Sequence, residues 1–352
     1  MRGLLLNLMI ILLIVGSLLT FLIWITSINN NSKPYQHYPR MKIISHSSES
    51  GKNHRETINK DRDNIFTAVE KQDDKNRLLR SQLSSTCHGL DKAIITQANT
   101  PLGSKLVYDG QKGRTIPVTL KNFNTFAKKN PFSNKTLHTC AVVGNGGILA
   151  NSSCGKNIDS AQFVIRCNLP PLSNGYEKHV GTKTDLVTAN PSIFLQKYEA
   201  LKKNQHKFVE NLQVYGKSLL LIPAFSFTVN TDVSLRAFSL TEESKSSIQT
   251  VFLNPEYLED LKRFWGSQGL RPSRLSTGMM MVSLAMELCA DIHLYGFWPF
   301  GFHPRDWHLL TNHYYDDKPP LRNFHTISDE FMILLLLHNR GMLRLHLDDC
   351  KH

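Results

Sequence analysis

The sequence lacks the short motifs that indicate binding sites for most metals and cofactors. Its six cysteines include no CxxC pair, and the glycine-rich stretch 144–147 has neither the GxGxxG spacing nor a Walker lysine. The single DxD triplet, Asp61-Arg62-Asp63, lies in the polar region between the apolar run at 4–25 and the apolar segments that follow Cys87. A zinc finger, a P-loop and a dinucleotide fingerprint are therefore unsupported. We expect no metal site and no bound cofactor.

Acidic residues are nearly absent from residues 103–138. This stretch holds one acid, Asp109, against seven lysines and arginines, in a chain whose net charge is +12. An excess of positive charge is compatible with binding to nucleic acid, to a membrane surface or to an anionic substrate, and charge alone does not distinguish these partners. Because Phe123, Phe126 and Phe132 interrupt the stretch, we interpret it as a solvated, partly packed edge of a domain.

Charge is also absent from the 22 residues between Leu4 and Ile25. At ~1.5 Å per residue, a helix of this length crosses the ~30 Å hydrocarbon layer of a bilayer. A cleaved signal peptide would have a shorter apolar run followed by small residues, whereas Trp24 stands at the end of this one. The pattern predicts a cytoplasmic tail at 1–3 and a transmembrane signal anchor at 4–25.

The cysteines and glycosylation sequons indicate which side of the membrane the rest of the chain occupies. In a chain that enters the secretory pathway, cysteines that lack the spacing of a zinc site are expected to form disulfides. Six cysteines allow fifteen different sets of pairs. Sequons at Asn30, Asn134 and Asn151 all follow the apolar segment. Both features agree with a luminal location for the part of the chain that follows the apolar segment.

The chain after residue 25 divides into a stem and a domain. Residues 26–86 are polar and mixed in charge, which is typical of a linker, with room for a short helix over 73–83. Apolar density rises after Cys87, so we place the domain at 87–352. From Thr139 onward, short β-rich runs alternate with helical patterns, which predicts an α/β fold with a doubly wound, mostly parallel sheet.

One βαβ unit has a glycine-rich first turn. The apolar run 140–143 predicts a buried strand, the turn 144–147 follows it, and 163–167 predicts the next strand. In doubly wound sheets, ligands bind beyond the carboxyl ends of strands. The spacing fits a tight structural turn as well as a nucleotide site.

Two later helices have clear start signals. Ser276 or Thr277 can cap an apolar helix over 279–288, and Ser328 can cap a helix over 329–339. The hydroxyls of the first pair would suit a phosphate, because helix N-termini favour anions. From the sequence pattern alone, we favour an ordinary N-cap over a phosphate site.

Three further side chains are candidates for chemistry. His313 lies in the run Asn-His-Tyr-Tyr-Asp, and His325 lies just before a predicted helix. Either imidazole can exchange a proton near neutral pH, although most of the fifteen histidines must be bystanders. Trp298 follows a predicted strand, where its ring would stack on a base or sugar or simply fill the core.

Together these segments resemble the four motifs of animal sialyltransferases, in the same order. Residues 140–192 resemble the large sialylmotif, and 271–292 the small one. Residues 313–316 match the third motif, and His325 with Glu330 matches the very small motif H-x-x-x-x-E. The details are most similar to the α-2,8-sialyltransferase subfamily, nearest its sixth, O-glycan-preferring type.

The resemblance implies a metal-independent variant of the GT-A fold that binds CMP-sialic acid as donor substrate. It implies that His325 is the general base and that His313 contacts the donor phosphate. It also implies two disulfides, Cys140–Cys289 and Cys154–Cys350, with Cys87 and Cys167 left over. The donor-binding residues that it implies, besides His313, are Asn145, Asn168, Ser276, Thr277, Gly278 and Trp298.

The function implied is an α-2,8-sialyltransferase that uses an inverting single displacement. Its acceptor would be a terminal sialic acid of a glycoprotein or ganglioside, and its location the Golgi membrane, as a single-pass type II protein with a luminal catalytic domain. No nucleic acid is expected, and homodimer formation stays open. The alternatives are a catalytically silent Golgi glycan-binding protein on the same fold and, from the βαβ turn alone, a nicotinamide-dependent oxidoreductase.

Overall fold

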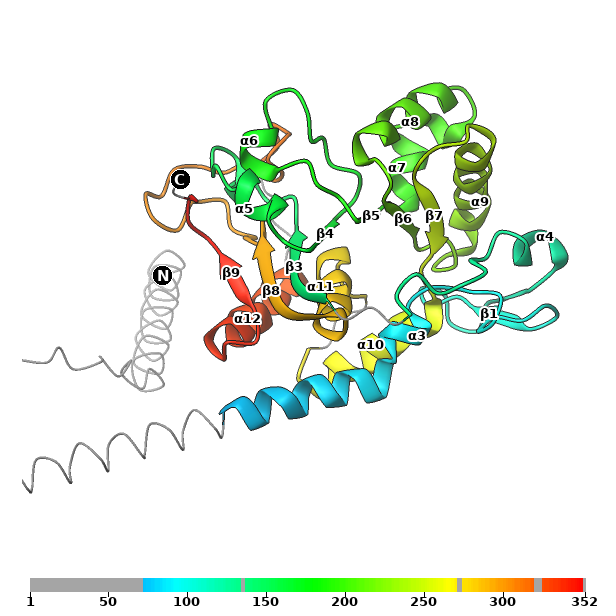
Figure 1. The fold of residues 1–352 in the computed structure, drawn as a ribbon, viewed down its shortest axis with the longest axis horizontal. Coiled ribbons are helices and arrows are strands. Elements are labelled where there is room, and N and C mark those ends of the chain that lie inside the picture. The colour runs from blue at the N-terminus through cyan, green and yellow to red at the C-terminus, as the bar shows by residue number, and fades with distance from the viewer. Residues whose placement is uncertain (1–71, 134–136, 271–273, 320–324, 351–352) are drawn as a thin grey trace, which may run out of the picture. The chain divides into compact units, whose positions relative to one another are not determined.

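The computed structural model describes residues 72–133, 137–270, 274–319 and 325–350, with the backbone alone for 325–328 (Figure 1). The predicted tail and membrane anchor, most of the predicted stem, and the sequons at Asn30 and Asn134 lie outside these residues. Among the helices described, none combines the length and the apolar character needed to cross a membrane.

A seven-stranded sheet with the order β7-β6-β5-β4-β3-β8-β9 forms the centre of the domain, and every neighbouring pair in it is parallel. The predicted doubly wound parallel sheet is thus confirmed. Such strands are buried on both faces, which is why they are continuous apolar runs in the sequence. The strands are β3 Leu137–Val143, β4 Phe163–Arg166, β5 Leu186–Thr188, β6 Leu219–Ile222, β7 Gln249–Phe252, β8 Cys289–Tyr295 and β9 Arg344–His346.

The strand order creates a switch point between β3 and β8. The chain builds outward from β3 through β4 to β7, then returns to place β8 on the other side of β3. The two strands pair up to their carboxyl ends, with Val143 opposite Tyr295. Connections leave this edge in opposite directions, and the crevice between them is where such sheets bind ligands.

Helices cover both faces of the sheet and bury two apolar cores. Successive residues of a strand point to opposite faces, so Val142 packs in one core with Trp265 and Leu334, while Ala141 packs in the other with Phe208. The helices are α3 Gly89–Lys92, α4 Leu120–Phe123, α5 Gly155–Asp159, α6 Glu177–Val180, α7 Pro191–Gln196, α8 Gln205–Leu212, α9 Thr228–Glu243, α10 Pro255–Ser267, α11 Thr277–Leu288 and α12 His325–Asn339.

Residues 72–87 form a helix that belongs to the packed domain. Leu79, Leu83 and Cys87 follow one another at helical spacing and are buried in the core. The Arg80 guanidinium donates hydrogen bonds to the main-chain carbonyls of Met286, Cys289, Ala290 and Met342. This helix therefore packs on the domain, although its sequence pattern is typical of the stem.

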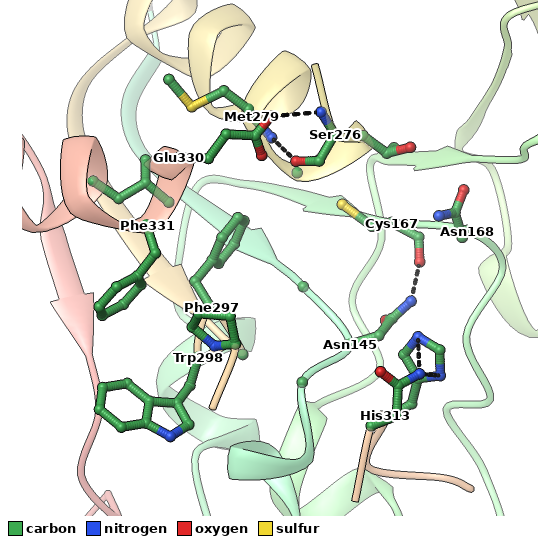
Figure 2. Close-up of a pocket in the computed structure, with 18 of the residues that line it drawn as sticks. Asn145, Cys167, Asn168, Ser276, Met279, Phe297, Trp298, His313, Glu330 and Phe331 are labelled. Atoms are coloured by element: carbon green, nitrogen blue, oxygen red, sulfur yellow. Dashed lines mark hydrogen bonds between the residues drawn. The ribbon is translucent and has the colours of Figure 1, made fainter. Parts of the chain in front are cut away.

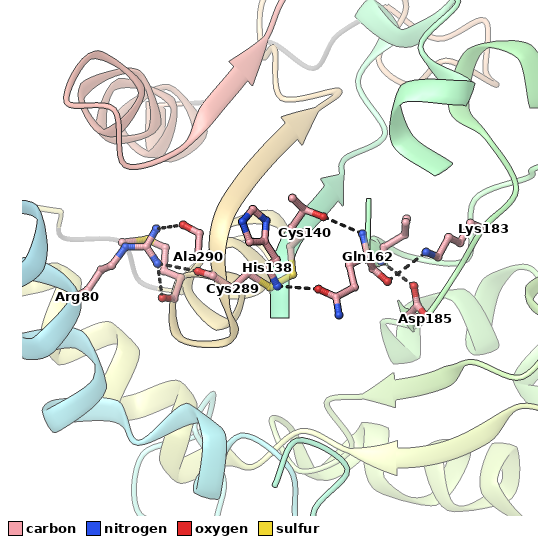
Figure 3. The surroundings of a disulfide bond; sticks show 11 residues. Arg80, His138, Cys140, Gln162, Lys183, Asp185, Cys289 and Ala290 are labelled. Carbon is pink, nitrogen blue, oxygen red and sulfur yellow. Dashed lines mark hydrogen bonds between the residues drawn. A yellow bond between two sulfur atoms is a disulfide. The ribbon is translucent and has the colours of Figure 1, made fainter. Parts of the chain in front are cut away.

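Two disulfides join distant parts of the chain, as the family resemblance implied. Cys140 pairs with Cys289, which links β3 to β8, and Cys154 pairs with Cys350 near the end of the chain. Figure 3 shows the first bridge between the Arg80 guanidinium on one side and Gln162 on the other. Cys87 and Cys167 remain free thiols, and burial raises the pKa of each to about 12.

The basic stretch 103–138 forms an edge of the domain. It contains the small antiparallel sheet of β1 Lys105–Val107 and β2 Thr115–Pro117. Phe126 and Phe132 are buried, so they anchor the stretch to the core. The cations described there are exposed, as expected of a solvated and partly packed edge: Lys105, Lys112, Arg114, Lys121, Lys128 and Lys129.

Candidate active site

A cavity of about 260 Å³ opens beyond the carboxyl ends of β3 and β8, at the switch point of the sheet. Figure 2 shows aromatic side chains along one side of it and amide and imidazole groups along the other. Its lining residues are Gly144, Asn145, Gly146, Cys167, Asn168, Ser276, Thr277, Gly278, Met279, Gly296, Phe297, Trp298, Pro299, Phe300, Thr311, Asn312, His313, Glu330, Phe331 and Leu334.

The glycine turn after β3 continues the contact between β3 and β8 beyond the strands. The backbone N–H of Gly144 donates to the carbonyl of Tyr295 (2.8 Å), and that of Gly146 to the carbonyl of Gly296 (3.0 Å). A Cβ atom on Gly146 would lie 2.7 Å from that same carbonyl oxygen, so no larger residue fits there without displacement. The turn is therefore a tight structural turn that also lines the cavity.

Asn145 presents an unpartnered oxygen at the cavity. Its Nδ2 donates to the carbonyl of Cys167 (2.8 Å), which fixes the side chain. Its Oδ1 is buried and has no hydrogen-bond donor among the described residues. Because a buried acceptor without a partner costs about 1–3 kcal/mol, such a group calls for a donor from a ligand or a bound water.

Asn168 occupies the equivalent position after β4. Its backbone is left-handed, with φ of 63°, a conformation that asparagine tolerates better than most residues. The side-chain oxygen accepts from the backbone N–H of Asn190 (3.3 Å), and the backbone N–H of Asn168 donates to the hydroxyl of Thr188 (2.9 Å). Asn190 also contacts the hydroxyl of Thr277 (3.2 Å), so it connects two sides of the cavity.

The helix α11 begins at the cavity, and Ser276 is its N-cap. The Ser276 hydroxyl accepts from the backbone N–H of Met279 (3.1 Å), which settles the capping role between Ser276 and Thr277. A Cβ atom on Gly278 would lie 2.8 Å from the ring of Phe297, so only glycine allows this ring to pack so closely. The start of α11 directs its partial positive charge toward the cavity.

Glu330 joins α12 to the start of α11. Its Oε1 accepts from the backbone N–H of Ser276 (2.7 Å), and the side chain is 4% exposed (Figure 2). Burial raises the pKa of this carboxyl, even though its hydrogen bonds from Ser276 work to lower it. The family resemblance implied only that Glu330 belongs to a motif, whereas its contacts make it a residue that positions the α11 cap.

The start of α12 differs from the prediction. The described part of the helix already includes His325, so Ser328 lies inside the helix and is not its cap. An N-cap stabilises a helix by only ~1 kcal/mol, which is too little to fix where a helix starts. His325 stands about one and a half turns before Glu330. The side chain of His325 lies outside the described residues.

His313 is held by a carboxylate at the open edge of the cavity. Its Nδ1 lies 2.8 Å from Oδ2 of Asp316, and its backbone N–H donates to Oδ1 of the same residue (3.0 Å). Desolvation works to raise the pKa of Asp316, but the N–H groups of His313 and Lys318 outweigh it and hold the pKa below its ordinary value. The ring stacks on Tyr315 at an interplanar angle of 6°.

Trp298 is part of the aromatic side of the cavity. Its Nε1 donates to the carbonyl of Phe302 (2.8 Å). The ring packs edge-on against Phe300 and Phe331, with centroids 4.8 Å and 5.4 Å away. The indole is half-buried, so it both fills space between β8 and α12 and borders the cavity.

The cavity thus brings together every donor-binding residue that the resemblance implied: Asn145, Asn168, Ser276, Thr277, Gly278, Trp298 and His313. Residues at the site that the sequence pattern did not identify include Cys167, Asn190, Phe297, Thr311 and Asn312. Asn190 follows the carboxyl end of β5, so the strand-end rule would have found it.

Comparison with known proteins places the chain in a family. The family model described as glycosyltransferase family 29 (sialyltransferase) matches residues 94–342. Human alpha-2,8-sialyltransferase 8F is 43% identical over 272 residues, which cover 77% of this chain and 68% of that protein. Human alpha-2,8-sialyltransferase 8E is also 43% identical over 272 residues, covering 77% and 72%.

The alpha-N-acetylneuraminide alpha-2,8-sialyltransferase of Xenopus tropicalis is likewise 43% identical, over 77% of this chain and 78% of its own length. A crystal structure of a mammalian sialyltransferase aligns with 73% of this chain and 90% of its own, at 22% identity and a TM-score of 0.49. The chain therefore belongs to glycosyltransferase family 29, the sialyltransferases.

Proposed function

We propose that this enzyme transfers sialic acid from CMP-sialic acid to a terminal sialic acid of a glycoprotein or glycolipid glycan and forms an α-2,8 linkage. Membership of the sialyltransferase family and three relatives named as α-2,8-sialyltransferases support the reaction and the linkage. The observation that carries the proposal to this cavity is the unpartnered Oδ1 of Asn145, a residue that lines the cavity at the switch point of the sheet.

The donor combines a base, a charged phosphate and a sugar, and the cavity has a group suited to each. The start of α11 offers backbone N–H groups and a helix dipole to the phosphate. His313, oriented by Asp316, adds a cation there when protonated. The amides of Asn145 and Asn168 supply directional hydrogen bonds to the nucleotide and the sugar.

The reaction is a single displacement at the anomeric carbon of the donor sugar. The acceptor hydroxyl oxygen forms the new bond while the bond to the phosphate oxygen breaks, and CMP leaves with the electron pair. Attack opposite the leaving group inverts the configuration, from the β-linked donor to the α-linked product. The site must stabilise negative charge on CMP and accept one hydroxyl proton.

We assign the proton acceptor as His325. An imidazole with an ordinary pKa of ~6.5 is largely neutral near pH 7 and can accept the proton. His325 belongs to α12, the same helix whose Glu330 holds the cap of α11. The Glu330 contact therefore fixes the helix of the base relative to the helix that faces the donor phosphate.

We place the protein in the Golgi membrane, with residues 4–25 as a single-pass type II anchor and the domain in the lumen. The chargeless run at 4–25 and the sequon at Asn151 support this placement. The two disulfides support it as well, because disulfides persist in oxidising compartments.

Binding of CMP tests the assignment of the cavity. Asn145→Ala removes the unpartnered oxygen and the bond to Cys167, so we expect the dissociation constant for CMP to rise roughly 10-fold, the equivalent of about 1.4 kcal/mol. Titration calorimetry on the full-length protein in detergent measures this change. The matched control is Asn157→Ala, which changes an exposed asparagine of α5. Equal CMP affinity in Asn145→Ala and wild type would place the donor elsewhere.

We also propose that transfer needs no metal ion. The displacement uses a helix start and histidines where other glycosyltransferases use a cation on the phosphate. Activity in EDTA should therefore stay within a few-fold of the untreated enzyme, measured as labelled sialic acid transferred per minute. A loss of activity that manganese restores would refute the metal-free reaction.

A further inference from the structure

The loop between β8 and α12 contains a hairpin at residues 301–310. Backbone hydrogen bonds close it, from Leu310 N to the carbonyl of Gly301 (2.9 Å) and from His303 N to the carbonyl of His308 (2.9 Å). The second bond sets the two histidines opposite each other across the turn. Their positions are therefore determined by backbone structure and not by flexible side chains alone.

Three side chains with metal-binding atoms converge in this turn. Nδ1 of His303 lies 3.0 Å from Oδ1 of Asp306, and Nδ1 of His308 lies 2.6 Å from the same oxygen. The two imidazole rings stack, with centroids 4.9 Å apart. All three ligand atoms lie within 4.8 Å of one another, and the part of the chain that is described holds no other such group of three.

We propose that His303, Asp306 and His308 form a binding site for a divalent transition-metal ion of the zinc class. Two imidazole nitrogens and one carboxylate oxygen are a donor set that zinc takes in three-ligand sites, with water in the fourth position. Zinc bonds of about 2.0–2.2 Å place tetrahedral ligand atoms roughly 3.3 Å apart. The separations of 3.0 Å and 2.6 Å from Asp306 Oδ1 to the two imidazole nitrogens need only a small opening to admit the ion.

The surroundings leave the cluster of three ligands accessible to a cation. His303 is buried and fixed, whereas the side chains of Asp306 and His308 are 63% and 55% exposed, so an ion and its water can reach them. Arg305, the cation within the turn, pairs with Asp348, which offsets its charge beside the site. Nitrogen ligands select zinc over magnesium, calcium and manganese, which prefer oxygen.

An ion at this hairpin would restrain the loop that borders the donor cavity. Trp298, at the start of the loop, donates to the carbonyl of Phe302 (2.8 Å), and residues 311–313 line the cavity just after the hairpin. The ion would join the two sides of the hairpin without contacting the donor. Its removal by EDTA is therefore compatible with continued transfer, and the inference does not depend on the proposed reaction.

Zinc titration of the full-length protein, stripped with EDTA and dialysed, tests the proposal. Wild type should bind one zinc ion by calorimetry, and cobalt should give the absorption bands of a tetrahedral site. Changes around metal ligands typically cost ~10–100-fold in affinity, so His308→Ala and Asp306→Asn should each weaken zinc binding by at least ~10-fold. His206→Ala, at an exposed histidine of α8, should bind zinc like wild type.

Asp306→Asn keeps an oxygen acceptor for both imidazoles, so it should melt like wild type when no metal is present. Zinc should raise the melting temperature of wild type and of His206→Ala, but not that of Asp306→Asn. Wild-type protein that takes up no zinc, or variants that all bind zinc with the wild-type affinity, would overturn the proposal.

Discussion

Full-length protein with His325→Ala should fold and be exported like wild type but transfer sialic acid ~10²–10⁴-fold more slowly. This is the range that a positioned general base contributes to a proton transfer. The nearest acidic group in the same motif, Glu330, accepts a hydrogen bond from Ser276 N–H and is buried, so it is not placed to replace the imidazole. The initial rate of transfer from labelled CMP-sialic acid measures the loss.

The matched control for this variant is His338→Ala, which removes an exposed histidine from the same helix α12. It should retain the wild-type rate. CMP affinity should be unchanged in His325→Ala, because the base acts on the acceptor hydroxyl and not on the nucleotide. A rate for His325→Ala within a few-fold of wild type would refute the assignment of the base.

Loss of either disulfide should prevent the domain from folding. The bridges span 149 and 196 residues of sequence, so each constrains the unfolded chain strongly. Removing a native disulfide costs ~2–5 kcal/mol, a large part of the ~5–15 kcal/mol that stabilises a typical domain. Cys140→Ala and Cys154→Ala should each be retained in the cell as protease-sensitive protein, measured by export and limited proteolysis.

Cys87→Ala is the control for this pair of variants, because Cys87 is buried in the same core as Cys140 but forms no disulfide. It should be exported in larger amount than either. Peptide mapping should recover the pairs Cys140–Cys289 and Cys154–Cys350. A peptide in which Cys167 is bonded to either Cys140 or Cys154 would disprove the bridges.

The sequence predicted the parts of the fold that local chemistry determines. Strands buried on both faces are apolar throughout, so the run that becomes β3 was evident, and the α11 cap follows from one hydroxyl at a helix start. The donor-binding residues came from motif resemblance. Their convergence depends on the strand order, which places β8 beside β3 across nearly 150 residues of sequence, and no local pattern contains that order.

The features that the sequence did not predict depend on tertiary contacts. Most residues of the helix 72–87 are polar, and only the burial of Leu79 and Leu83 against the core reveals that it belongs to the domain. The cluster of His303, Asp306 and His308 has no familiar spacing, and it becomes a site only when the hairpin closes.

The most direct test of the proposed function is transfer to matched acceptors. Full-length protein with labelled CMP-sialic acid should label a sialylated glycoprotein or ganglioside, and methylation analysis should find the new substitution at O8 of the previous terminal sialic acid. The same acceptor after sialidase treatment should take up no label. Equal labelling of the sialidase-treated acceptor would contradict the α-2,8 linkage, and binding of CMP without any transfer would show a silent glycan-binding protein instead.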